Sequence, residues 1–331
     1  MPWIREDTKK SPPPSVQSRD VSPETERARE ADPYETAFVP RDPRKTLRTL
    51  VIPESAFSGI EREMKLFRQR RKLREWGVDQ LDPRALSIRI NLFGPEGTGK
   101  THAAEGIAHE LNIQLIDVQL GDILSKYVGD SEKSLAGAFR VAARTGALLL
   151  FNEADSLLSR RRDPGDGMGA EHHNALRNAM ITHLDAFDGI VVFTTNRQRV
   201  FDPAFKSRIR THIAFALPDR TARLQMWTRH LLPTIPREQT VDPIWLAEES
   251  EGLSGRDVVH VMVLAAVAAV DRPLGKDRVL AADIRQAMSD IRSRNQDVAI
   301  ESRNAVTETV PENEIPAEVR EKLREKREAC A

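Results

Sequence analysis

Gly94-Pro95-Glu96-Gly97-Thr98-Gly99-Lys100-Thr101 is the stretch that decides the fold, because it fits the phosphate-binding pattern G-x-x-x-x-G-K-[ST]. Residues 88–93 before it are typical of a strand, and residues 102–111 after it are typical of a helix. The glycines let backbone N–H groups converge on phosphate oxygens, and the helix dipole adds to their attraction. Lys100 reaches the outer phosphates and the Thr101 hydroxyl can bind Mg²⁺. The stretch, with His102 next to it, therefore predicts a nucleotide-binding loop rather than a chance glycine turn.

Composition permits an enzyme and excludes several other classes. The chain has 331 residues, enough for about two domains. It contains 50 Lys plus Arg and 50 Asp plus Glu, so no overall field favours nucleic acid or an acidic membrane. A single cysteine, Cys330, rules out an internal disulfide framework. The first residues lack a secretory signal, and the longest apolar run, at residues 258–270, is too short to span a bilayer. We expect a cytoplasmic protein.

Four segments of different character divide the chain. Residues 1–46 are charged and rich in proline, and we expect them to form a disordered arm. In residues 47–218, short apolar runs alternate with helical stretches. Residues 219–293 carry only helical patterns, which predicts a small all-helical domain, and residues 294–331 form a charged tail. The alternation predicts an α/β domain, with a parallel sheet covered by helices on both faces.

Two expected strands end in polar residues that suit phosphate chemistry. Residues 148–151 are apolar and lead into Glu153, a carboxylate placed to polarise an attacking water. Residues 191–195 lead into Asn196. In an open parallel sheet, the carboxyl ends of the strands surround the ligand, so Asn196 can hold the water in line with the γ-phosphate. The alternative is that these polar groups merely mark the ends of strands.

With these residues in view, the chain resembles an AAA+ ATPase of the group that includes katanin, spastin and the proteasomal and membrane-bound unfoldases. The resemblance covers roughly residues 47–291. It rests on the phosphate-binding loop and on five further stretches in family order: residues 125–132, residues 148–155, Thr195-Asn196, residues 201–208 and residues 252–257. It implies a P-loop NTPase sheet with a helical lid, and ATP with Mg²⁺ as cofactors.

The resemblance also assigns arginine roles. It makes Arg208 a finger that enters the ATP site of a neighbouring subunit, which implies a homo-oligomeric ring, expected to be a hexamer. Many relatives have a second arginine where Thr211 stands here, and Arg210 is a possible substitute. Arg256 is expected to contact the γ-phosphate from the lid, the alternative being a salt bridge with Asp257.

A polypeptide substrate follows from another matching stretch. Lys126, Tyr127 and Val128 resemble the pore loop of unfoldase rings, where an aromatic side chain grips an extended chain. The alternative is that Tyr127 is an ordinary surface residue. Residues 160–169 would form a second pore loop or a simple surface loop.

Two residues depart from the family pattern. Glu96 replaces a usual proline, but the glycines are intact and we expect binding to survive. Asn152 replaces the aspartate that holds the hydration shell of Mg²⁺, so with Thr101 it would hold the metal through water and without a charge.

These observations leave one expected function and two rivals. We expect a working ATPase that threads polypeptide through a central pore. The first rival is an assembly switch that binds ATP and hydrolyses it slowly because of Asn152. The second, nucleic-acid remodelling, rests on the basic cluster at residues 68–74, which a solvated helix face explains better because acidic residues are interleaved with it.

Overall fold

A computed structural model describes residues 32–82, 84–123, 130–155, 157–158, 168–196, 202–273 and 275–306. In this part of the chain, five parallel strands form one sheet in the order β2-β3-β4-β1-β5. The strands are β1 (Ile88–Phe93), β2 (Leu115–Val118), β3 (Leu148–Phe151), β4 (Ile190–Thr195) and β5 (Thr211–Ala214). The expected parallel α/β sheet is confirmed.

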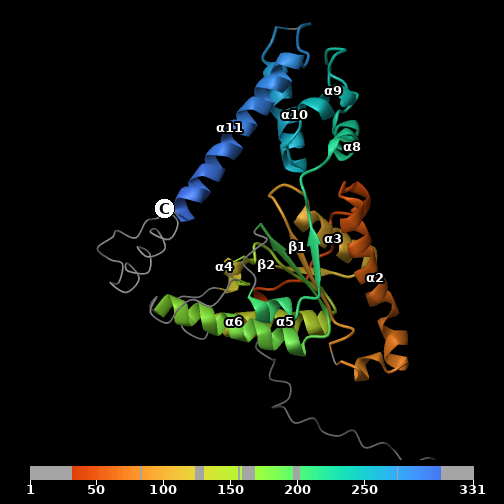
Figure 1. Cartoon of the computed structure of the whole chain (residues 1–331), viewed down its shortest axis with the longest axis vertical. Helices are drawn as coiled ribbons and strands as arrows, with labels where there is room; N and C mark the ends of the chain where they lie inside the picture. The colour runs from red at the N-terminus through yellow and green to blue at the C-terminus, as the bar shows by residue number, and fades with distance from the viewer. Residues whose placement is uncertain are drawn as a thin grey trace, which may run out of the picture.

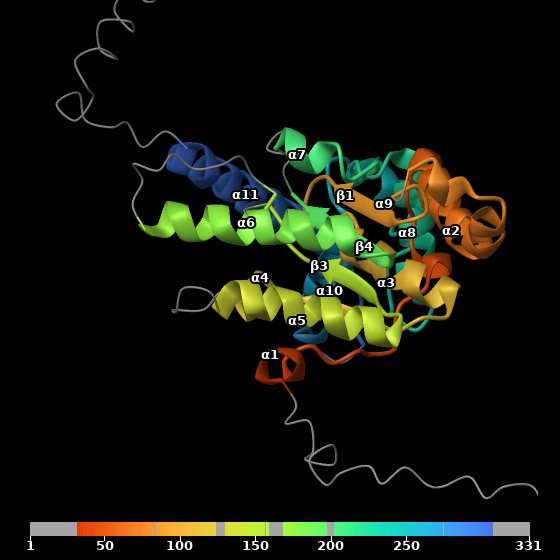
Figure 2. The same cartoon turned by 90° about the horizontal axis from the view of Figure 1, so that it is seen from below.

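The sheet is buried on both faces, which explains its nearly continuous apolar strands. One face packs against α2 (Glu54–Glu75) and α3 (Lys100–Leu111), with Ile60 and Ile107 in that core. The other packs against α5 (Asp130–Thr145) and α6 (Met168–Ala186), with Leu135 and Met180 in the second core. Figures 1 and 2 show α5 and α6 side by side on this second face.

The strand order decides which polar residues meet. β1 pairs with β4 on one side and β5 on the other, and β4 pairs with β3. The loops that leave β1, β3 and β4 therefore open at the same edge of the sheet. This edge is where the phosphate-binding loop and the two polar strand ends were expected to converge.

Short helices connect these elements. They are α1 (Pro33–Thr36), η1 (Leu47–Thr49), η2 (Val78–Gln80), α4 (Leu120–Ile123) and α7 (Pro203–Lys206). Among the described residues, no helix combines the length and the apolar composition that a membrane crossing requires.

A helical lid follows β5 and lies above the sheet in Figure 1. It consists of α8 (Arg220–His230), α9 (Pro243–Glu249), α10 (Gly255–Val270) and α11 (Ala281–Val306). Trp227, Leu246, Val258 and Ile284 are fully buried in its separate core. α10 starts at a capping box, in which the Ser254 hydroxyl accepts from the backbone N–H at residue 257 and the carboxylate there accepts from the Ser254 N–H.

The expected boundary between lid and tail, at residue 293, is too early. α11 crosses this boundary and continues to Val306. Residues 307–331 lie outside the described part of the chain.

The expected disordered arm is wrong for residues 32–46, which pack against the α/β domain. Phe38 is only 2% exposed and joins the core under α5. Arg41 forms an antiparallel bridge with Leu115 at the open edge of β2. Arg140 on α5 pairs with Glu35 at 2.9 Å, and Figure 2 shows α1 beside α5. One aromatic anchor and a few ion pairs thus order a stretch whose composition alone suggests disorder.

We predict that Phe38→Ala lowers the free energy of unfolding by about 3 kcal/mol, because it removes a fully buried aromatic side chain. Urea unfolding followed by circular dichroism measures the change. Val39→Ala is the matched control, since Val39 is 73% exposed and should lose little. Equal losses in the two variants would show that residues 32–46 do not contribute to the core.

Candidate functional site

The loop between β1 and α3 forms a cradle that only glycine can make. Gly94 has a φ of 145°, and a Cβ there would lie 2.0 Å from the carbonyl oxygen of Phe215. Gly97 has a φ of 72°, and a Cβ there would lie 2.3 Å from Ser254 Oγ of the lid. Both positions therefore need a residue without a side chain. The result is a loop that ends at the N-terminus of α3, the expected geometry for binding phosphate.

Lys100 holds this loop in shape from inside. Its Nζ donates to the carbonyl oxygens of Gly94 and Pro95, each at 2.8 Å. The Thr98 hydroxyl also donates to the Pro95 carbonyl at 2.8 Å. Burial lowers the pKa of Lys100, although the carboxylates of Glu96 and Asp155 oppose that effect. The ammonium is therefore pre-positioned beside the cradle, and a phosphate can replace the carbonyl oxygens as its partner.

A cavity of about 680 Å³ opens above the cradle and lies between the α/β domain and the lid. This volume suits a nucleotide-sized ligand. Leu50, Val51, Met226 and Val259 contribute apolar side chains, and Arg256 contributes a cation from the start of α10. The site is thus apolar on its walls and rich in hydrogen-bond donors at its phosphate end.

His102 lines this cavity, as the sequence predicted for a nucleotide-binding residue. Its ring Nε2 lies 3.1 Å from the carbonyl oxygen of Thr46 and 3.1 Å from the hydroxyl of Thr49. Burial lowers its pKa, which favours the neutral ring at neutral pH. His102 therefore joins the start of α3 to the segment around η1.

Glu153 lies two residues after the end of β3 and lines the same cavity. Its side chain is exposed and its backbone φ is 50°, an uncommon conformation for a residue with a side chain. Such a conformation costs about 1–3 kcal/mol and gathers at functional sites. Its backbone N–H donates to the Thr194 hydroxyl at 3.3 Å, which ties the turn to β4.

Asn196 follows β4 and reaches the mouth of the cradle. Its backbone N–H donates to Asp155 at 3.2 Å, and its amide lies 3.5 Å from Glu96. The other carboxylate oxygen of Glu96 accepts from Arg256 at 3.3 Å. Glu96, which departs from the family pattern of the loop, thus lies between the Asn196 amide at the end of β4 and the Arg256 guanidinium on the lid. The Arg256 partner in the structure is Glu96 rather than Asp257.

Asn152 lies at the centre of a polar cluster below the cradle. Its Oδ1 accepts from the hydroxyls of Thr101 at 3.0 Å and Thr194 at 3.1 Å. Its Nδ2 donates to Asp117 on β2 at 2.6 Å. Thr101 and Asn152 are therefore brought together as predicted. A hydroxyl and a carbonyl oxygen beside a phosphate cradle suit Mg²⁺, which usually takes few protein ligands and completes its shell with phosphates and water.

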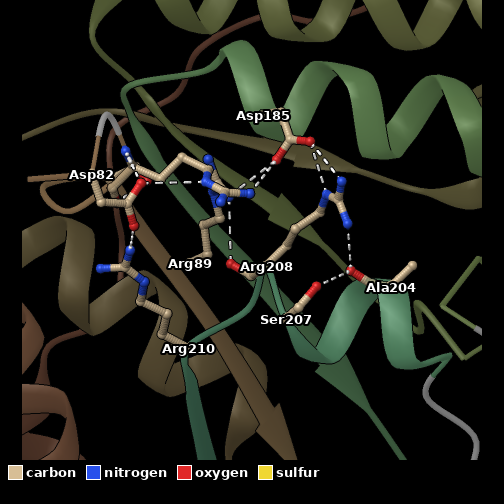
Figure 3. A network of polar contacts seen from close by, with 9 residues as sticks. Asp82, Arg89, Asp185, Ala204, Ser207, Arg208 and Arg210 are labelled. Carbon is tan, nitrogen blue, oxygen red and sulfur yellow. Dashed lines mark hydrogen bonds and ion pairs between the residues drawn. The ribbon is translucent and has the colours of Figure 1, made fainter.

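Arg208 does not line the cavity of its own chain, and its side chain is held against Asp185 (Figure 3). Its Nε and Nη2 lie 2.9 and 2.8 Å from Asp185, and its Nη1 donates to the Ala204 carbonyl at 2.9 Å. Burial opposes ionisation of Asp185, but hydrogen bonds from Arg208 and Arg84 outweigh it and lower the pKa of that carboxyl. The Arg208 side chain is thus fixed in one orientation.

Arg210 belongs to a different pair. It contacts Asp82, as Figure 3 shows, and it donates to the Ala85 carbonyl at 3.4 Å. Arg89, which sequence reasoning missed, lies buried between the two arginines, and its Nη1 is 3.9 Å from Asp185. A buried arginine within an apolar strand was the signal that could have pointed to this network.

The structure therefore brings most of the predicted site residues to one place. The cavity is lined by Glu96, Gly97, Thr98, Gly99, Lys100, Thr101, His102, Asn152, Glu153, Asn196 and Arg256. Arg208 lies apart. Lys126, Tyr127 and Val128 lie outside the described residues, as does most of the stretch at 160–169. Asp117 was not predicted, although a carboxylate inside an apolar strand pattern marks it.

Comparison with known proteins identifies the family of the central part of the chain. Residues 90–217 match the model of the ATPase family associated with various cellular activities (AAA). Residues 90–217 are an AAA ATPase domain. The expected resemblance is confirmed for these residues.

Named relatives of this AAA domain are much longer proteins. A cell division cycle protein 48 homolog from Archaeoglobus fulgidus is 37% identical over 188 residues, which are 55% of this chain and 25% of that protein. Spastin from Ixodes scapularis is 32% identical over 203 residues, 58% of this chain and 30% of that protein. An ATP-dependent zinc metalloprotease FtsH from Buchnera aphidicola is 31% identical over 186 residues, 54% of this chain and 30% of that protein. The chain thus spans less than a third of the length of these relatives.

A solved structure shares the fold. The crystal structure of the FIGL-1 AAA domain superposes with a TM-score of 0.61 and covers 76% of this chain and 85% of its own. At 23% sequence identity, this similarity shows the fold alone.

Proposed function

We propose that this chain hydrolyses ATP, with Mg²⁺, in a homo-oligomeric ring, expected to be a hexamer, and uses the energy to remodel or unfold threaded protein. The observation that carries the proposal is the convergence of Lys100, Thr101, Glu153 and Asn196 on one cavity beneath a lid. Each is suited to one task in phosphoryl transfer.

Each residue of the site would have its own role in hydrolysis. The cradle N–H groups and Lys100 would bind the phosphates, and Thr101 and Asn152 would hold Mg²⁺, which neutralises charge on the β- and γ-phosphates. Glu153 is exposed and lines the cavity, so its carboxylate can accept a proton from the attacking water. Asn196 would orient that water, while Arg256 would follow the γ-phosphate from the lid.

The position of Arg208 supports hydrolysis in a ring. An arginine that is fixed outside the cavity of its own chain can complete the site of a neighbouring subunit. A preformed pair with Asp185 keeps the guanidinium oriented, so little conformational entropy would be lost when it meets a phosphate. Both Arg208 and Arg210 have a carboxylate partner, so the preference for Arg208 rests on its place in the matching stretch at residues 201–208.

Asn152 favours a second candidate, an ATP-binding switch that turns over slowly. The amide keeps the position of a metal ligand but lacks its charge. In that case ATP would control assembly of the ring, and the lid would report the bound state. A role on nucleic acid has less support, because Arg68, Arg70 and Arg74 of the basic cluster bind groups on their own surface.

The first test is steady-state ATP turnover. We expect Mg²⁺-dependent phosphate release by the unmodified chain, and Glu153→Gln should slow it at least about a hundredfold because it removes the general base. Binding of a fluorescent ATP analogue should persist. Glu171→Gln, an exposed glutamate on α6, is the control. Binding without any turnover of the unmodified chain would favour the switch.

Mixing two inactive variants tests the finger. Arg208→Ala subunits keep an intact cradle, and Glu153→Gln subunits keep an intact finger. Each alone should be slowed, the first by about a thousandfold. A mixture should regain turnover, because a Glu153→Gln neighbour supplies Arg208 to the intact cradle.

Lys206→Ala, an exposed cation beside Arg208, is the control and should keep full activity. If the mixture stays as inactive as its components, Arg208 does not act across subunits.

A third measurement separates threading from switching. A fluorescent protein with an unstructured tail should lose its fluorescence with the unmodified chain and ATP. We expect Tyr127→Ala to stop this loss while ATP turnover continues, since the aromatic grip is removed and the cradle is untouched. Trp76→Ala removes an aromatic that is 69% exposed at the end of α2, and it should have no effect. Unchanged unfolding by Tyr127→Ala would contradict the pore role.

A further inference from the structure

Asn152 does not stand alone in the polar cluster below the cradle. A carboxylate on the neighbouring strand β2, Asp117, accepts from its amide nitrogen at 2.6 Å. The pairing of β2 with β3 places Asp117 opposite Leu150, two residues before Asn152. The charge that is missing from the end of β3 is thus present one hydrogen bond away, on an adjacent strand.

This contact decides which end of the Asn152 amide faces the cradle. An ionised carboxylate only accepts hydrogen bonds, so the amide nitrogen has to face Asp117. The hydroxyls of Thr101 and Thr194 can donate or accept, and they would tolerate either orientation. Among the contacts that the described residues make with Asn152, Asp117 therefore specifies that the oxygen faces Thr101. With the opposite orientation, the amide N–H groups would face the place of a cation.

We propose that Asp117 is a positioning residue that compensates for Asn152: it orients the amide oxygen toward Mg²⁺ and supplies the negative charge behind it. Donation to a carboxylate polarises the amide and makes its oxygen a stronger acceptor. Carboxylates behind metal ligands commonly orient and tune them in this way. The inference rests on the proposed Mg²⁺–ATP site and deepens it.

Further contacts hold Asp117 in place. Gln119 donates to the same carboxylate oxygen at 3.1 Å, and Arg41 lies 3.7 Å from the other oxygen. Arg41 also pairs with Glu105, at 3.3 Å. Its positive charge is therefore shared between two carboxylates and does not fully neutralise the charge of Asp117. The side chain of Asp117 is 27% exposed, which leaves its charge only partly screened by water. The carboxylate is thus anchored on one side and directed at Asn152 on the other.

A purely structural role makes a different prediction. If Asp117 serves only to attach residues 32–46 through Arg41, its loss would lower stability and leave the Mg²⁺ requirement unchanged. The measurement is therefore the binding of a fluorescent ATP analogue by the full chain at increasing Mg²⁺, with a parallel titration in EDTA.

We expect Asp117→Asn to raise the half-saturating Mg²⁺ concentration about tenfold to a hundredfold, with little change in affinity in EDTA. The double variant Asp117→Asn with Asn152→Asp keeps one carboxylate and one amide but exchanges their positions. Its half-saturating Mg²⁺ concentration should return close to that of the unmodified chain. Asp42→Asn is the matched control, because Asp42 is exposed and binds Gln114 near the start of the same strand.

An unchanged Mg²⁺ requirement in folded Asp117→Asn would overturn the inference and leave the proposed function standing. If the unmodified chain shows no Mg²⁺-dependent nucleotide binding, the proposed function falls and the inference with it. Should Asp117→Asn fail to fold, Asp117→Ser decides. A Mg²⁺ requirement at least about tenfold above that of the unmodified chain supports the inference, and an unchanged requirement overturns it.

Discussion

The position of the whole site depends on how the chain leaves β1. The N–H of Gly94 donates to the Thr195 carbonyl at 3.2 Å, and the N–H of Phe215 donates to the Phe93 carbonyl at 2.7 Å. The last peptide of β1 is therefore held between β4 and β5. Because the Phe215 carbonyl lies where a Cβ would be, the loop has to turn at glycine. This turn places the cradle beside the ends of β3 and β4.

The remaining polar groups reach the cradle through the same sheet. Glu153 and Asn152 follow β3, and Asn196 follows β4, so parallel pairing alone brings them to one edge. The lid closes the site from above, because its Arg256 N–H donates to the Gly97 carbonyl at 3.2 Å. Glu96 then joins Arg256 to the Asn196 amide at the mouth. Phosphates that enter this place have to compete with the Glu96 carboxylate for the same donors.

Much of this arrangement was predictable, because its signals are local. The strand before Gly94, the glycines and Lys100 lie within a few residues of one another, and strand ends in a parallel sheet meet without further information. The apolar runs also predicted the lid helices. These features depend on short-range pattern and on general sheet geometry.

The features that were missed depend on contacts between distant segments. Nothing in the composition of residues 32–46 shows that Phe38 enters the core below α5. Asp117 precedes Asn152 by 35 residues, and only the register of β2 against β3 makes them neighbours. Asp185 and Arg208 likewise meet through the path of the chain after α6. Asn152 stood out in the sequence as a departure from the family pattern, but its partner Asp117 did not.

The backbone bond between Gly97 and the start of α10 has a mechanical consequence. α10 packs along α11, whose 26 residues extend for about 39 Å at 1.5 Å per residue. The Gly97 bond therefore connects the phosphate loop to both long helices of the lid. A rotation of about 10° about the start of α11 would move its far end by about 7 Å, given that rise per residue. Any tilt of the lid that follows a change in the phosphate loop would thus be largest at the end of α11.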